Sequence, residues 1–352
     1  MTSRHFLSLA AGLLVVAASA MANVSVPLAL GVSGDRLTVN GEPRFLVFVS
    51  YFDALDARSL DADLRALARS VDGIRIFANW WDVAPDGDCR HAFTDRTLFE
   101  QTEAGAIGLR PERLARLQEV LRVARRSGLV VDLTFASEPV RGSSRLTDTV
   151  NKEGRACPEP GFRNVVEWKA VAPAFGETAA ALAADEFDHV FFDLQNEAGH
   201  DMNMAGDDDL AQLVRAVRAT DPKRLLTVSS DSRDADEQAN RVRALGLSLL
   251  TFHGRRGEGW GKRTAGDVRA FREALARAGT PVPVYVGEPD PLDHGHGDRE
   301  FRESVTGARQ AGAAAWTLHT RAGFQLDDQT LGERLDPVTR QVLDALPRWL
   351  GR

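Results

Sequence analysis

The chain has 352 residues, a formal net charge of −7 and 43% hydrophobic residues. This hydrophobic content is sufficient for a large buried core, and no basic tract or interleaving of basic and aromatic residues indicates a nucleic-acid partner. Length alone permits two average domains or one α/β barrel, so the pattern of elements must decide.

The first residues have the pattern of an export signal. Arg4 precedes an apolar run from Phe6 to Val16, and small residues follow as far as Ala22. A charged start, a short apolar run and a small-residue cleavage site are typical of secretory signal peptides. We therefore expect residues 1–22 to be removed and residues 23–352 to be secreted or periplasmic, without stable membrane insertion. An uncleaved membrane anchor is the alternative, although the run is short for a span of about 20 residues.

A short hairpin is expected next, because residues 28–31 and 36–40 flank Ser33 and Gly34. Apolar runs then alternate with amphipathic segments. The runs predict eight core strands at Phe45–Val49, Val71–Phe77, Leu129–Phe135, Val190–Leu194, Leu225–Val228, Leu247–Phe252, Val282–Val286 and Ala313–Leu318. The amphipathic segments predict helices at Leu60–Ala68, Pro111–Arg126, Trp168–Ala184, Leu210–Ala219, Ala235–Leu245, Ala265–Ala278, Glu300–Gln310 and Pro337–Leu346.

Near-continuously apolar strands, each followed by a helix, indicate a parallel sheet buried on both faces. We predict an α/β fold, a (β/α)8 TIM barrel with a short N-terminal β-hairpin cap, as one catalytic domain over residues 23–352. An open doubly wound sheet is the alternative. Helix-to-strand links such as residues 127–128 are brief, whereas residues 78–110 and 136–162 form long segments after strands. Function is therefore expected at the carboxyl ends of the strands.

Two glutamates stand where predicted strands end. Asn196 and Glu197 follow the run 190–195, and Glu288 follows the run 282–287. Two carboxyl groups facing one cleft are the minimal equipment for glycosidic bond hydrolysis, one protonated and the other ionised. Across a narrow barrel mouth a separation of about 5 Å is feasible, and this spacing predicts a covalent intermediate and retention of configuration.

These residues resemble a known family. Asn196-Glu197 on strand four, the Gly-Glu pair ending at Glu288, the run Gly73-Ile-Arg-Ile76, His253 and Trp316 together resemble the clan A glycoside hydrolases, especially the cellulase-like family five. The resemblance spans the chain from about Leu28 to the C-terminus.

The resemblance implies a role for each matching residue. Glu197 becomes the general acid/base and Glu288 the nucleophile. Asn196 contacts the sugar hydroxyl next to the anomeric carbon, and Arg75 keeps Glu288 ionised. His253 lines the site, and Trp316 forms the floor beneath the reacting sugar. The chain departs from the family at strand three, where it has no histidine, and after His253, where Arg255 replaces a tyrosine that contacts the nucleophile.

Other side chains around the mouth are candidates for substrate binding. Trp80, Trp81 and Trp260 follow strands, where indoles can stack on sugar rings, although at most one of Trp80 and Trp81 is expected to do so. Basic residues crowd two loops and are compatible with an acidic sugar such as a uronate, or with salt bridges inside the loops. They are Arg141, Arg145, Lys152 and Arg155 after strand three, and Arg255, Arg256, Lys262 and Arg263 after strand six.

Two further features are open to more than one interpretation. Cys89 and Cys157 are an even pair in a chain expected to be exported, which favours a disulfide over two free thiols. His294 and His296 lie near two aspartates in one loop, which suggests a metal site. However, barrel metallohydrolases gather their ligands from several strands, so neither a metal nor another cofactor is expected.

The sequence thus predicts a retaining glycoside hydrolase that cleaves β-linked glycans by a two-glutamate double displacement, with an oligosaccharide or polysaccharide as its substrate. A catalytically silent carbohydrate-binding barrel is one alternative. A metal-dependent hydrolase using His294 and His296 is the other.

Overall fold

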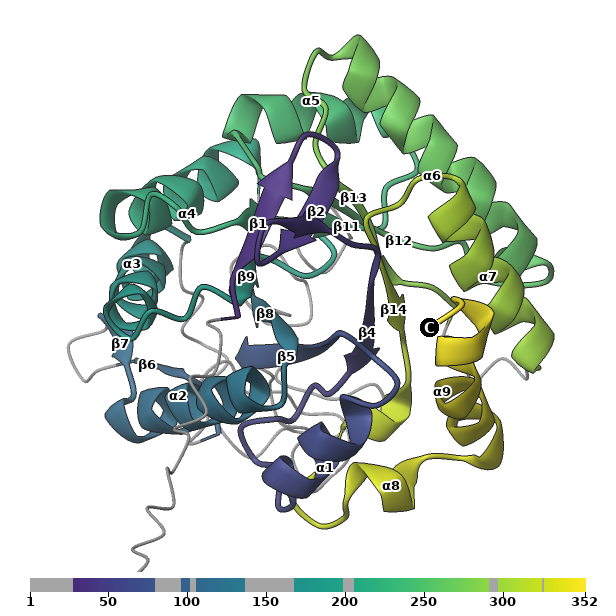
Figure 1. Cartoon of the computed structure of the whole chain (residues 1–352). Helices are drawn as coiled ribbons and strands as arrows, with labels where there is room; N and C mark the ends of the chain where they lie inside the picture. Colours follow the sequence, from purple (N-terminus) through teal and green to yellow (C-terminus); the bar gives the residue numbers. More distant parts are fainter. Residues whose placement is uncertain are drawn as a thin grey trace, which may run out of the picture.

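A barrel of parallel strands forms the centre of the molecule, and helices surround it (Figure 1). The structure is a computed structural model that describes residues 28–79, 96–101, 106–136, 168–198, 206–290, 297–324 and 326–352. Within these residues the barrel sheet has the order β10-β9-β8-β5-β4-β14-β13-β12-β11, with every neighbouring pair parallel.

The ring is closed by one segment of chain. β10 (Leu226–Thr227) and β11 (Ser229–Ser230) are separated only by Val228, and they pair with β9 and β12 respectively. The other barrel strands are β4 (Leu46–Ser50), β5 (Gly73–Asn79), β8 (Val130–Ala136), β9 (Val190–Asp193), β12 (Leu250–His253), β13 (Val284–Glu288) and β14 (Ala315–Leu318). The predicted (β/α)8 TIM barrel is therefore confirmed. Strands begin up to three residues later than predicted, because residues such as the buried Leu247 enter the core before strand pairing starts.

Side chains along each barrel strand alternate between the interior of the barrel and the layer under the helices. In β12, Leu250 and Phe252 pack in the outer core, whereas the Thr251 hydroxyl lies 2.8 Å from the hydroxyl of Thr227. His253 continues the inward set. Because apolar residues fill the outer layer, the polar residues of several strands converge inside the barrel.

The N-terminal hairpin closes the opposite end of the barrel. β1 (Leu30–Ser33) and β2 (Arg36–Val39) are antiparallel, and a short β3 (Glu42–Pro43) adds a third strand that the sequence pattern did not predict. Leu37 and Val39 pack against interior residues that include Phe48, Phe191 and Tyr285. The hairpin crosses the barrel in Figure 1. This end is therefore filled, and the strand ends at the other mouth are where a site can form.

The helices surrounding the barrel follow the predicted order. They are α1 (Leu60–Leu67), α2 (Pro111–Arg126), α3 (Trp168–Ala184), α4 (Asp207–Thr220), α5 (Ala235–Leu245), α6 (Trp260–Arg277), α7 (Asp298–Gln310) and α9 (Pro337–Trp349). Short elements that were not predicted are β6 (Phe99–Gln101), β7 (Ile107–Leu109), a 3-10 turn at Arg321–Gly323 and α8 (Leu331–Arg334). Among the residues described, no helix combines the length and apolar character that a membrane crossing requires.

Candidate active site

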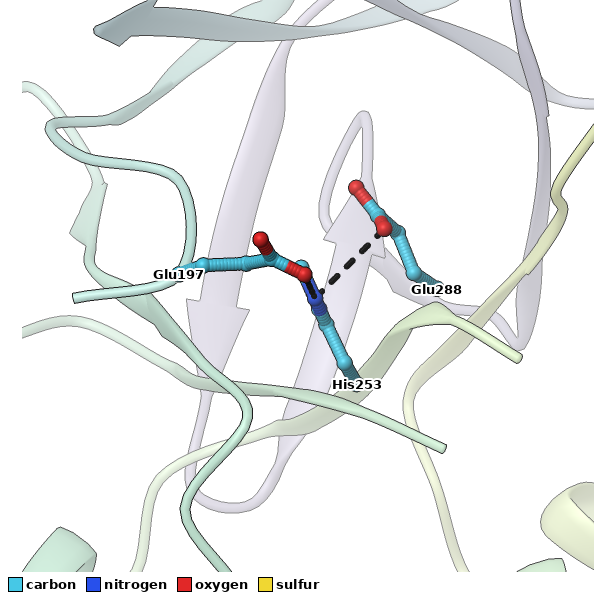
Figure 2. A group of neighbouring side chains, drawn as sticks. All are labelled: Glu197, His253 and Glu288. Atoms are coloured by element: carbon cyan, nitrogen blue, oxygen red, sulfur yellow. Dashed lines mark hydrogen bonds and ion pairs between the residues drawn. The ribbon is translucent and has the colours of Figure 1, made fainter. Parts of the chain in front are cut away.

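Three side chains from three strand ends converge at the open mouth of the barrel (Figure 2). Glu288 ends β13, His253 ends β12, and Glu197 lies four residues beyond β9. One carboxylate oxygen of each glutamate and one ring nitrogen of His253 all lie within 4.8 Å of one another. Nδ1 of His253 lies 3.2 Å from Oε1 of Glu197 and 3.5 Å from Oε2 of Glu288. The fold thus brings together the two carboxyl groups that the sequence placed far apart in the chain.

Both glutamates reach the cleft through departures from regular strand geometry. Glu197 has a φ of 52°, in the left-handed region that is uncommon for residues other than glycine. Val284 and Val286 pack in the outer core, so strict alternation along β13 would turn Glu288 outward as well. The register between β12 and β13 shifts at His253, which pairs with Glu288. Irregularities of this kind redirect side chains next to active sites.

Arg75 on β5 holds the site from behind. Its side chain has no exposed surface, and its guanidinium donates hydrogen bonds to Oε1 of Glu288 and, at 2.7 Å, to Oδ1 of Asn196. Its Nε donates to the hydroxyl of Thr134 at 3.2 Å. A single buried cation therefore fixes the orientation of both Glu288 and Asn196, as a site-facing arginine in an apolar strand should.

Beneath Arg75 lies a polar network that sequence reasoning did not identify. Asp132 and Asp193 are fully buried, each 3.3 Å from a guanidinium nitrogen of Arg75. Tyr285 donates a hydrogen bond to Asp132 at 3.1 Å and lies 2.5 Å from the hydroxyl of Thr317. Burial raises the pKa of Asp132 to about 8, although Arg75 opposes this rise. The sequence signal for this network is a polar residue at alternate positions of a strand that is otherwise apolar, because alternate side chains point into the barrel.

His319 also contacts Glu288 and was missed from the sequence. It follows β14, its Nδ1 lies 3.1 Å from the hydroxyl of Ser50, and its Nε2 lies 3.7 Å from Oε2 of Glu288. Burial lowers the pKa of His319 to about 4. Neither tyrosine of the chain takes the place of the tyrosine that contacts the nucleophile in the resembled family. Tyr51 donates to Asp63 and Tyr285 donates to Asp132, and His319 lies beside Glu288.

The two glutamates are both stabilised in their ionised forms. Burial raises the pKa of Glu288, but the charges of His253, His319 and Arg75 outweigh it and hold this pKa far below its ordinary value. Burial also raises the pKa of Glu197, but the hydrogen bond to His253 and the charge of His253 outweigh burial. The pKa of Glu197 therefore lies below its ordinary value, by less than the pKa of Glu288 does. The negative charge of Glu288 acts in the opposite direction on Glu197. Glu288 is therefore prepared to act as a nucleophile, whereas Glu197 must gain a proton before it can act as an acid.

A second arginine approaches the glutamates from the open side. The guanidinium of Arg256 lies 3.7 Å from Oε1 of Glu197 and 4.0 Å from Oε2 of Glu288, and its side chain is 53% exposed. The sequence pattern grouped this residue with the other basic residues of its loop. The structure singles it out as the cation that faces both carboxylates from the cleft.

Two tryptophans do not lie where they were expected. Trp316 is fully buried in the outer core, and its indole N–H donates to the hydroxyl of Ser304 on α7 at 2.9 Å. It cannot form the floor of a sugar site, because the alternation of β14 places Thr317 and His319 inward and Trp316 outward. Trp260 is the first residue of α6 and packs edge-on against Phe301. It is core, because the helix begins five residues earlier than the predicted start at Ala265.

Several predicted residues lie outside the described residues. These are Trp80, Trp81, Cys89, Cys157, His294, His296 and the basic residues 141–155, as well as the predicted signal peptide at residues 1–22. The expected rim indoles and disulfide therefore stay predictions, and the metal loop stays an alternative.

Glu197, His253 and Glu288 also have the donor types and spacing of a divalent cation site. A cation there would compete with charges already present, since Arg75 bonds one oxygen of Glu288 and Arg256 faces both carboxylates. The same three residues serve equally well as the acid/base, nucleophile and lining of a glycosidase, so the cluster alone does not require a metal.

Comparison with known proteins yields similar solved structures but no matching family model or curated protein. No protein-family model matches the chain. No curated protein matches it either. Among solved structures, an endo-β-mannanase from Eisenia fetida is 15% identical with a TM-score of 0.59, covering 92% of this chain and 96% of its own. A glycoside hydrolase family five mannosidase from Rhizomucor miehei is 10% identical with a TM-score of 0.58, covering 92% and 99%.

The catalytic domain of an endoglucanase from Thermobifida fusca is 18% identical with a TM-score of 0.54, covering 90% of this chain and 96% of its own. At these identities the similarity shows the fold. The chain therefore has the barrel fold of the cellulase-like clan A glycoside hydrolases, as its motifs predicted.

Proposed function

We propose that this chain is a retaining glycoside hydrolase that cleaves β-linked glycans by double displacement. The observation that carries the proposal is the approach of the Glu197 and Glu288 carboxylates to within 4.8 Å at the mouth of the barrel. Retaining enzymes hold their two carboxyl groups about 5 Å apart, whereas inverting enzymes need room for a water molecule between them. The fold supports the same conclusion, because the similar structures named above are a mannanase, a mannosidase and an endoglucanase.

In the first step an oxygen of Glu288 attacks the anomeric carbon while Glu197 donates its proton to the departing glycosidic oxygen. In the second step Glu197 takes a proton from water, whose oxygen attacks the anomeric carbon and releases Glu288. Arg75 holds Glu288 ionised and oriented for the first step, and the ring of His319 lies beside the same carboxylate. Asn196, which Arg75 fixes by a hydrogen bond, would contact the reacting sugar. With a leader at residues 1–22, the glycan would be met in the periplasm or outside the cell.

The lowered pKa of Glu197 indicates that substrate must alter its surroundings. Bound sugar excludes water from the cleft, and the ionised Glu288 then favours a protonated neighbour. Once Glu288 carries the sugar its charge is lost, and Glu197 returns to the ionised form that a general base requires. The pKa of one carboxyl group thus follows the state of the other.

A trapped intermediate tests the proposal directly. A β-glycoside with fluorine beside the anomeric carbon and a dinitrophenolate leaving group should form a stable ester with Glu288. The fluorine slows both steps, and the activated leaving group speeds only the first, so the covalent intermediate accumulates. Mass spectrometry of a digest should find the added sugar on the peptide containing Glu288. An adduct elsewhere would contradict the nucleophile assignment. Sugar binding with neither adduct nor turnover would instead identify a catalytically silent carbohydrate-binding barrel.

Replacing Glu197 tests the acid role separately. Glu197→Ala should lower kcat/KM by about 10²- to 10⁴-fold for phenyl glycosides, the usual range for general acid catalysis. The loss should be less than about tenfold for dinitrophenyl glycosides, whose leaving group departs without a proton. Equal losses for both leaving groups would contradict the role. Assays with and without a chelator distinguish a metal-dependent hydrolase, which should lose activity when the metal is removed.

A further inference from the structure

In the segment after β12, Arg256 faces the cleft, whereas Arg255 and Arg263 make contacts that stabilise the segment. Arg255 pairs with Asp267 on α6, with Nε and Oδ1 3.0 Å apart. Arg263 donates to the backbone carbonyl of Arg256 at 3.1 Å. Of the basic residues that the sequence grouped on this loop, Arg255 and Arg263 therefore stabilise the loop, whereas Arg256 faces the cleft.

The backbone of this loop is fixed on several sides. Arg233, which precedes α5, donates to the carbonyl of Gly254 at 3.1 Å. The buried Asp290 accepts from the N–H of Gly257 at 2.7 Å, and Gly257 adopts a φ of 91° that favours glycine. The position of the Arg256 backbone is thus set before any ligand arrives, which lowers the entropy cost of using its side chain for binding.

The guanidinium of Arg256 is held by charge rather than by hydrogen bonds. Its distances of 3.7 Å to Glu197 and 4.0 Å to Glu288 exceed those of a hydrogen bond. Within the part of the chain that the structure describes, no residue accepts a hydrogen bond from this side chain. Its N–H donors are therefore available to a ligand, and their planar arrangement suits a carboxylate or sulfate.

An anionic sugar entering this cleft needs such a cation. Glu197 and Glu288 both repel negative charge, and Arg75 lies behind Glu288 with no exposed surface. Among the described residues, Arg256, with its side chain 53% exposed, is the cation beside the two carboxylates that a ligand can reach. A ligand anion that draws Arg256 toward itself would also withdraw a positive charge from Glu197 and so favour the protonated form of that residue.

Resting on the proposed function, we propose that the substrate carries an anionic group, the carboxylate of a uronate or a sulfate ester, on the sugar at the scissile bond, and that Arg256 binds this group. Arg256 is then the residue that sets specificity between acidic and neutral sugars. Its movement toward the ligand couples recognition of the sugar to protonation of Glu197.

Matched pairs of substrates test this proposal. Nitrophenyl β-glucuronide carries a carboxylate where nitrophenyl β-glucoside carries a hydroxymethyl group. The β-galacturonide and β-galactoside form a second pair of this kind. A sulfated glucoside distinguishes a sulfate ester from a carboxylate as the anion that is bound. The wild-type protein should have the higher kcat/KM for the anionic member of a pair. Arg256→Met should reduce that value by about ten- to a hundredfold, the scale of charge-assisted hydrogen bonds, whereas the neutral member should lose much less when both are compared below the basic limb of the pH profile. Arg255→Met, one residue away but paired with Asp267, is the control and should leave the preference unchanged.

The pH dependence of kcat/KM provides a second test, because a purely structural role of Arg256 would leave it unchanged. Within the described part of the chain, the charged or titratable groups that face Glu197 are Arg256, His253 and Glu288. Arg256→Met should raise the pKa of Glu197, so the basic limb of kcat/KM for the neutral sugar should move to higher pH. Arg255→Met should not move it. Preference for the neutral sugars, or equal losses for both members of a pair, would overturn the proposal.

Binding measured without turnover separates this proposal from the proposed function. Calorimetry of nitrophenyl β-glucuronide and β-glucoside with Glu288→Gln protein, with and without Arg256→Met, reports recognition alone. Tighter binding of the glucuronide that depends on Arg256 would support the anion site even if the wild type hydrolyses neither. Binding of neither sugar, or binding that does not depend on Arg256, would refute it even if a neutral glycoside is cleaved.

Discussion

Glu288→Ala is expected to lower kcat for an aryl β-glycoside by at least about a thousandfold, the scale seen when a catalytic nucleophile is removed. Azide should restore turnover, because the deleted carboxylate leaves space for a small anion on the same side of the anomeric carbon. The product should be a glycosyl azide of inverted configuration, since azide performs one displacement where the wild-type protein performs two. NMR of the product anomer together with steady-state rates measures both effects.

Two variants control this experiment. Glu288→Gln keeps an oxygen that can accept from Arg75 but fills the space, so it should lose activity without rescue by azide. Glu197→Ala with azide should give a glycosyl azide of retained configuration, because azide then attacks the sugar already attached to Glu288. Wild-type rates in Glu288→Ala, or a retained azide product from it, would mean that another group is the nucleophile.

Arg75→Met is expected to produce the largest loss of stability. The substitution leaves Glu288, Asp132 and Asp193 buried without their shared cation, and breaking a buried ion pair costs about 3–5 kcal/mol. Without Arg75 the pKa of each carboxyl group rises, so the native variant binds more protons than the native wild type. The penalty therefore grows as pH rises, and it should be smaller at about pH 5 than at about pH 8. Urea unfolding at both pH values measures it.

The matched control is an arginine on the surface. Arg65 pairs with Asp61 one turn away on α1, with 65% of its side chain exposed. Arg65→Met should cost less than about 1 kcal/mol and show little dependence on pH, because solvent screens exposed pairs. A small, pH-independent effect of Arg75→Met would show that the network inside the barrel does not depend on the charge of Arg75.

The sequence predicted the helices and strands of the barrel more completely than it predicted the arrangement of side chains at the site. Helices α2, α3 and α5 have the bounds that periodicity gave them, and each predicted barrel strand exists. Short elements such as β6, β7 and α8 were not predicted, because helices or strands of three or four residues carry too little periodicity to be recognised.

At the site, side chains at strand ends could be located along the chain but not oriented. Trp316 and His319 are three residues apart, and only the alternation of β14 decides that the histidine faces Glu288 while the indole faces Ser304. In a strand that is apolar on both faces, the sequence pattern does not reveal which parity points inward. The same ambiguity hid the layer formed by Asp132, Asp193 and Tyr285.

By itself the sequence determined the closed barrel, the positions of Glu197 and Glu288 at the ends of strands, and the need of Arg75 for an anionic partner. These follow from local periodicity, and from the cost of burying a charge without a partner. Only the tertiary structure decided that the two carboxylates meet, that His319 lies beside Glu288, and that Arg256 rather than Arg255 faces the cleft. Those outcomes depend on a left-handed residue, a register shift and a few loop contacts, which join residues far apart in the chain and leave no periodic trace in it.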